Sequence, residues 1–180
     1  MTRSDLTDRI MSVSAIVAAL AAVLVAAYEA RINREYQRLS VWPRIQQSDS
    51  FVPDQPYTRN VTNVGMGPAM VRSVEIRVDG NICRTWTKVT EALLKRRIPN
   101  TIISWLHNGA VLVANKDVTV LKIPPGDDAR AFWEASQGDR LSIRICYSSL
   151  YGECWMSDTA REEPTRVSQC ASDPEKEFQQ

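Results

Sequence analysis

Four cysteines are the residues of this chain whose type and spacing most directly predict chemistry: Cys83, Cys146, Cys154 and Cys170. An even number of cysteines that follows an apolar N-terminal segment permits two disulfides, with three possible connectivities. A hairpin centred near Leu150 would place Cys146 opposite Cys154, as a disulfide requires. We therefore expect a Cys146–Cys154 disulfide and a second between Cys83 and Cys170. The alternative is four unpaired thiols in a cytosolic domain.

Other groups that could do catalytic or metal chemistry are sparse. His107 is the single histidine, and it stands beside Asn108-Gly109, where a solvated turn residue is the simplest interpretation. A nucleophile–histidine pair could be built only through His107, and no serine lies in a GxSxG context. The cysteine spacing does not match a zinc knuckle. The sequence therefore predicts no catalytic residue, no cofactor and no metal site. A hydrolase that acts through His107 is the weakest alternative.

An uncharged run from Ile10 to Tyr28 is the part of the sequence that indicates the cellular location of the protein. As a helix the run reaches about 28 Å, close to the thickness of the hydrocarbon core of a bilayer. We expect a transmembrane helix here. A secretory signal peptide, cleaved after Val25-Ala26-Ala27, is one alternative, and a buried core helix is the other.

Small side chains recur every four residues along this predicted helix, at Ser14, Ala18, Ala22 and Ala26. Small residues at this spacing let two helices approach closely and gain van der Waals contact. The pattern predicts weak self-association, or association with a partner helix, through this face. The alternative is an alanine-rich anchor that has no partner.

Two features of the sequence favour opposite orientations of the anchor. Arg31, Arg34 and Arg38 follow the apolar run, and their number favours a cytoplasmic C-terminal domain under the positive-inside rule. The cysteines favour an oxidising compartment. We expect a cytoplasmic N-terminus and a C-terminal domain in the periplasm. A cytoplasmic domain is the alternative.

The segment after the anchor is dominated by an alternation of apolar and polar residues, which is typical of half-buried strands. Asp79-Gly80 predicts a tight hairpin, and we expect Asn115-Lys116 to join two paired strands at 110–113 and 118–123. This pattern predicts a mainly β protein, with a small antiparallel immunoglobulin-like β-sandwich and one or two short helices. A small antiparallel barrel is the alternative. Further strands are expected at 41–45, 57–64, 74–78 and 141–147, and helices at 86–96 and 127–137, the second ending at Gly138.

Composition limits the classes of function. The net charge is +1 and hydrophobic residues make up 44% of the chain, which excludes bulk disorder and leaves no basic footprint for nucleic acid. The C-terminal tail is polar and charged, and we expect it to be extended or partly disordered although it contains Cys170. The expected parts are an N-terminal flank (1–9), a transmembrane helix (10–28), a helical stalk (29–39), a β-sandwich domain (40–160) and a polar tail (161–180).

A predicted structural turn contains Asn63, Gly65, Gly67 and Pro68. The two glycines permit positive φ, Pro68 fixes the start of the next strand, and Asn63 can bond nearby backbone groups. The segment from Asn63 to Ala69 resembles a turn in uncharacterised bacterial proteins that have one N-terminal membrane helix and a small β-sandwich. The segment from Ile145 to Trp155 is similar to their late hairpin. The resemblance covers residues 40–172; it implies a bacterial periplasmic protein and supplies no active site.

These patterns together predict binding rather than catalysis. We expect a membrane-anchored accessory or scaffold protein that contacts the bilayer and a membrane or envelope protein partner through its sandwich and its anchor helix. A second copy could bind through the helix. An envelope sensor or ligand-binding module is the alternative, and an aromatic-lined pocket would distinguish it. A signalling protein that faces the cytoplasm is a further alternative.

Overall fold

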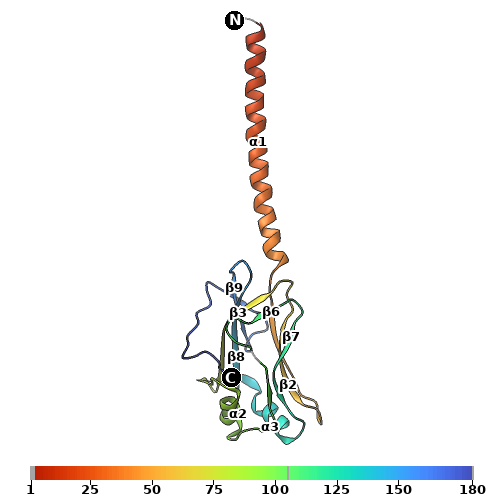
Figure 1. Ribbon diagram of the computed structural model, residues 1–180, viewed down its shortest axis with the longest axis vertical. Coiled ribbons are helices and arrows are strands. Elements are labelled where there is room, and N and C mark those ends of the chain that lie inside the picture. The colour runs from red at the N-terminus through yellow and green to blue at the C-terminus, as the bar shows by residue number, and fades with distance from the viewer. Residues whose placement is uncertain (1–2, 105, 180) are drawn as a thin grey trace. The chain divides into compact units, whose positions relative to one another are not determined.

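The structure is a computed structural model that describes residues 3–104 and 106–179 (Figure 1). The chain divides into two compact units, one ending at Ser40 and the other beginning at Val41. The first unit is an apolar helix, and the second contains two antiparallel sheets and two further α-helices. The described part of the chain therefore contains both helices and strands and is not mainly β. The predicted antiparallel sheets are present.

Helix α1 (Arg3–Ser40) continues without a break through residues 29–39, the predicted stalk. Its segment Met11–Ser40 is long and apolar enough to cross a membrane. The Ser14 hydroxyl donates a hydrogen bond to the Met11 carbonyl at 2.9 Å, so this polar group is satisfied within the helix, as a membrane span would require. The four small residues of the predicted packing face are all exposed on α1.

The first sheet has the strand order β1-β2-β7-β5, and each neighbouring pair is antiparallel. The predicted strand at 41–45 is wrong except at its last residue, because the ladder begins only at Ile45, which pairs with Asn63. The carbonyls of Trp42 and Arg44 instead accept hydrogen bonds from the amides of Met66 and Val64. The strands are β1 (Ile45–Ser50), β2 (Tyr57–Asn63), β7 (Asp117–Ile123) and β5 (Ile102–Ile103).

The second sheet has the order β10-β9-β8-β3-β4, and β6 also pairs with β3. The predicted pairing of 110–113 with 118–123 is wrong. The turn that follows β6 takes the chain from one sheet to the other, so Leu112 pairs with Ala69 of β3. The strands are β3 (Ala69–Val78), β4 (Asn81–Ile82), β6 (Val111–Leu112), β8 (Leu141–Ser148), β9 (Cys154–Asp158) and β10 (Thr165–Val167).

The predicted tight hairpin joins β3 and β4. Val78 pairs with Asn81, and the two residues between them, Asp79 and Gly80, have φ values of 48° and 80°. Positive φ at both central residues is the requirement of a type I′ turn, which Asp-Gly satisfies well. The hairpin prediction is confirmed.

Two short helices lie at the ends of strands. In α2 (Trp86–Leu94) the Thr85 side chain accepts a hydrogen bond from the Lys88 amide at 3.2 Å, which caps the helix. Helix α3 (Asp127–Ala135) ends at a right-handed cap, Ser136. The expectation that Gly138 caps α3 is wrong, because Gly138 begins a separate 3-10 helix, η1 (Gly138–Arg140).

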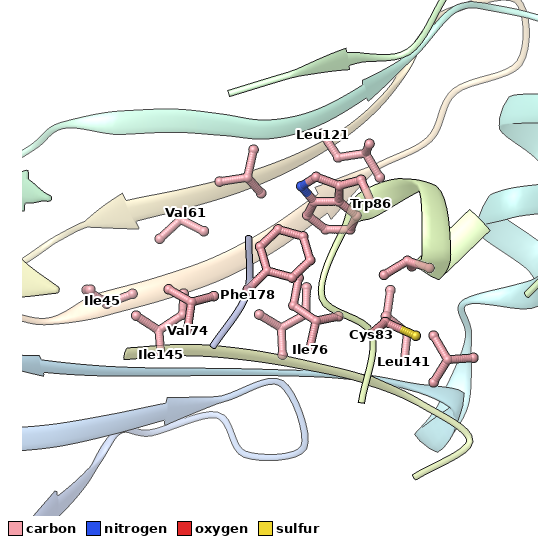
Figure 2. Packing of buried hydrophobic residues seen from close by; sticks show 14 of the residues in the cluster. Ile45, Val61, Val74, Ile76, Cys83, Trp86, Leu121, Leu141, Ile145 and Phe178 are labelled. Carbon is pink, nitrogen blue, oxygen red and sulfur yellow. The ribbon is translucent and has the colours of Figure 1, made fainter. Parts of the chain in front are cut away.

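One hydrophobic cluster takes side chains from both sheets and both short helices (Figure 2). Tyr57, Phe132 and Tyr147 are its largest fully buried members. The Tyr57 and Phe132 rings lie 5.1 Å apart, so α3 packs against β2 through aromatic contact.

The C-terminal tail, expected to be extended or partly disordered, contributes one short strand and one buried side chain to this domain. Strand β10 pairs with β9, with Arg166 opposite Trp155. Phe178 is only 8% exposed and belongs to the cluster. The polar composition of the tail concealed this single apolar anchor.

A buried tyrosine makes stability depend on pH. The Tyr147 hydroxyl accepts a hydrogen bond from the Ile45 amide at 3.2 Å, and burial raises the pKa of Tyr147 to about 12. The folded state therefore favours the neutral phenol. Its contribution is complete below pH 10, where both states are protonated, and it is lost as pH rises from 10 to 12 and the unfolded chain ionises first.

We expect Tyr147 to lower the free energy of unfolding by about 2 kcal/mol between pH 9 and pH 11.5. Denaturant unfolding of the full chain in detergent at pH 9 and pH 11.5 would measure it. Tyr147→Phe should show a smaller drop between the two pH values. An equal drop in both proteins would contradict the assignment to Tyr147.

Candidate functional site: an apolar cavity between the sheets

A cavity of about 530 Å³ lies between the two sheets. Its walls are mostly aliphatic, and its few polar side chains come from a loop and from the C-terminal segment. The lining residues on the sheets are Val61, Val74, Ile76, Val120, Ile143 and Ile145.

The cavity walls follow from the alternation in the sequence. Successive residues of a strand point to opposite faces, so Val74 and Ile76 of β3 face the same side of their sheet. Ile145 pairs directly with Val74 in the neighbouring strand β8, which extends this apolar surface. Val61 of β2 and Val120 of β7 form the opposite wall. The pattern that predicts half-buried strands thus also produces two facing aliphatic surfaces.

Two aromatic rings enclose the cavity. Trp86 is the first residue of α2, and Phe178 comes from the C-terminal segment. Their ring centroids lie 5.4 Å apart with an interplanar angle of 72°, an edge-on arrangement. Figure 2 shows the Phe178 ring between Trp86 and the side chains of Val74 and Ile76. The cavity is therefore lined by two aromatic rings as well as by aliphatic side chains.

Among the described residues, the polar lining consists of Ser104, His107 and Gln179, which belong to the loop after β5 and to the C-terminal segment. His107 Nδ1 lies 2.7 Å from the Asn108 carbonyl oxygen, and the imidazole is exposed. Trp105 is outside the described residues. An amphiphile could place its chain against the sheets and its polar end toward the loop. In the described residues no three His, Cys, Asp or Glu side chains are grouped to hold a metal ion.

The four cysteines do not pair as expected. Cys146 of β8 forms a disulfide with Cys170, and their Cα atoms are 5.6 Å apart. Cys83 and Cys154 are free thiols. The predicted Cys146–Cys154 pair is wrong because Cys154 lies opposite Ser148, and Cys146 lies opposite Met156. The predicted pairing of Cys83 is also wrong: Cys83 is buried in the hydrophobic cluster, where desolvation raises the pKa of its thiol.

The predicted turn, through the Asn63 side chain, is hydrogen-bonded to the backbone at the start of the domain; we call this arrangement the clamp. The Asn63 side chain is fully buried; its Oδ1 accepts hydrogen bonds from the amides of Arg44 and Gly65, both at 3.1 Å. Its Nδ2 donates to the carbonyls of Gly67 and Leu112, both at 2.8 Å. One amide side chain thus joins four backbone positions. Pro68 is half-buried and directly precedes β3.

The two glycines of this turn serve close approach and not positive φ. Neither lies in the left-handed region. A Cβ atom on Gly67 would overlap the backbone of Val41, and one on Gly65 would overlap the backbone between Trp42 and Arg44. The interpretation of these glycines as positive-φ residues is therefore wrong.

Sequence reasoning missed the cavity and its two aromatic residues. Phe178, a lone aromatic residue within a charged tail, was the one available signal, since a large apolar side chain is often buried. No pattern in the sequence predicts the cavity between the sheets, because the cavity depends on contacts between distant segments.

Comparison with known proteins gives no relative for this chain: no family model, no curated protein and no solved structure matches it.

Proposed function

We propose that this protein is a non-catalytic, membrane-anchored binding module that holds a single-chain amphiphile, of the fatty-acid class, in the cavity between its sheets. The cavity carries this proposal. Its volume lies within the range of small-molecule sites, which are mostly apolar with a few placed polar groups. The aliphatic walls match an acyl chain.

The finer arrangement belongs to the same proposal. We propose that the two sheets form an immunoglobulin-like sandwich, that α1 crosses the membrane with its N-terminus in the cytoplasm, and that the domain lies in the periplasm. The Cys146–Cys170 disulfide supports this orientation, because disulfides persist in oxidising compartments. A domain tethered to a membrane would also be close to a source of amphiphiles, because the bilayer contains them.

Photocrosslinking tests the proposed ligand class. The full chain would be reconstituted into lipid nanodiscs with a diazirine derivative of palmitic acid, irradiated and digested. Mass spectrometry would then locate the labelled peptides. We expect labels on α1, which reports partition into the bilayer, and on cavity strands β3 and β7. The ratio of cavity to α1 labels corrects for the amount of probe in the membrane.

Val120→Trp, which fills the cavity from β7, should lower this ratio about tenfold, equivalent to about 1.4 kcal/mol of binding. Val113→Trp is the matched control, because Val113 is 57% exposed and does not line the cavity. Label on α1 alone in the wild-type protein, at saturating probe, would overturn the proposal, whatever the stability of the variants.

An accessory role with a protein partner is a second candidate, favoured by exposed apolar side chains around the start of the domain. Met70 pairs with both Val111 and Ser148, so β6 and the loop after β8 flank the same end of β3. Large patches of this kind mark interaction sites. The exposed residues are Trp42, Val64, Met66, Val111, Val113, Leu150 and Tyr151. A membrane or envelope protein would be the partner here, and the face of Ser14, Ala18, Ala22 and Ala26 could bind a second anchor helix.

A further inference from the structure

The C-terminal segment 171–179, which we call the latch, places one aromatic ring in the cavity. Phe178 is the single buried residue of the latch, and most of its other residues are exposed. The ring lines the cavity together with Trp86, so its removal would add volume to the cavity for an apolar chain. Figure 2 shows the latch entering beside β3, with Phe178 directed between the sheets.

A few hydrogen bonds hold the latch. The Phe178 amide donates to the Val74 carbonyl at 2.9 Å, and the Val74 amide donates to Glu177 Oε1 at 3.0 Å. The Gln179 amide donates to the Arg84 carbonyl at 2.6 Å. Arg84 Nη2 donates to the Pro174 carbonyl at 3.2 Å. A segment with one buried side chain and few backbone bonds opens locally at low cost.

The edge of β3 explains why the latch is short. Strand β6 covers this strand at Ala69 and Met70, and β4 covers it at Arg77 and Val78. Between them the Val74 amide and carbonyl face the latch. This gap accommodates one paired residue, which suits the chain's own end and is too narrow for a regular added strand.

The disulfide fixes the start of the latch. Cys170 is bonded to Cys146 of β8, so opening of the latch moves only the residues that follow Cys170. Because the tethered end stays close to its site, its effective concentration there remains high and reclosing is intramolecular.

We propose that the latch is an internal plug: Phe178 occupies part of the binding site, and an incoming acyl chain displaces it. This inference rests on the proposed function and adds its regulation. The ring then narrows the cavity when no ligand is bound and leaves it on binding, and the displaced C-terminal segment carries the signal of occupancy outward.

The palmitate crosslinking assay tests the plug when the probe is kept far below saturation. Phe178→Ala should raise the ratio of cavity to α1 labels about tenfold, because the probe no longer competes with the ring. Phe51→Ala is the matched control: it removes another aromatic ring, stacked 5.1 Å from Trp133, that does not line the cavity. We expect Phe51→Ala to leave the ratio within about twofold of wild type.

Hydrogen exchange in the unaltered protein gives an independent readout. Saturating palmitate should accelerate exchange of the Phe178 and Gln179 amides, since both lose their acceptors when the latch opens. Cavity labelling that Phe178→Ala leaves unchanged, with exchange of these amides unaltered by palmitate, would overturn the plug and leave the proposed function standing. Absence of cavity label in both proteins would overturn both. Label in Phe178→Ala alone would support the plug.

Discussion

Gly67→Val is expected to unfold the extramembrane domain or to lower its unfolding free energy by about 3–5 kcal/mol. A side chain at this position would overlap the carbonyl oxygen, the carbonyl carbon and the Cα of Val41. These are backbone atoms, which cannot rotate away as the end of a flexible side chain can. The amide of Gly67 also donates to the Trp42 carbonyl at 3.3 Å, so moving the loop would break the clamp around Asn63.

Thermal unfolding of the full chain in detergent would measure this effect, with tryptophan fluorescence or near-UV circular dichroism as the signal. Gly152→Ala is the control, because Gly152 has φ of 78° and a Cβ there would meet nothing within 4 Å. Backbone strain alone should cost Gly152→Ala about 1 kcal/mol. A Gly67→Val protein that melts no lower than Gly152→Ala would contradict the overlap.

The two kinds of glycine show where sequence reasoning stops. Asp79-Gly80 could be predicted correctly because the residues that need positive φ are the turn itself. Gly65 and Gly67 are required by a crossing segment more than twenty residues away in sequence, at 41–44. A local motif contains no information about which distant backbone lies against it.

The hairpin between β8 and β9 shows a second limit. Strand β8 could be predicted from alternation, and a hairpin after it from the segment around Leu150, but the register of the hairpin could not. A loop centred one residue later than expected pairs Ser148 with Cys154 and moves Cys146 opposite Met156. Each shift of the centre by one residue moves the partner by two, so a small error in the turn changes which cysteines can bond.

The cavity had the least support in the sequence. Its aliphatic walls follow from the same alternation that predicts β3, β7 and β8. The space between those walls depends on how the two sheets pack against each other. Its closure depends on Phe178, which reaches Trp86 from the far end of the chain. Contacts of this range are set by the whole fold.

Cys170→Ser is expected to lower the unfolding free energy by about 3 kcal/mol, because the Cys146–Cys170 bond closes a loop with a sequence separation of 24. Cys154→Ser is the matched control: it also removes one sulfur, yet Cys154 is a free, half-buried thiol and should cost less than about 1 kcal/mol. A Cys146–Cys154 disulfide would instead make Cys154→Ser the damaging change. Denaturant unfolding of both variants, with and without reductant, separates these outcomes, and reductant should erase most of the difference between wild type and Cys170→Ser.

Thiol tagging in native membranes connects this bond to the compartment of the domain. The membranes would be denatured and then treated with a mass-shifting maleimide, with or without prior reduction. The four cysteines of the chain should give two tags without reduction and four with reduction, since one pair is bonded and two thiols are free. Four tags without reduction would show that the bond is absent in the cell. Because cytosolic thiols are kept reduced, that result would favour the cytoplasmic orientation that Arg31, Arg34 and Arg38 support. The latch would then lack its tether, and its reclosing over the cavity would depend only on β10 and on the contacts of Phe178.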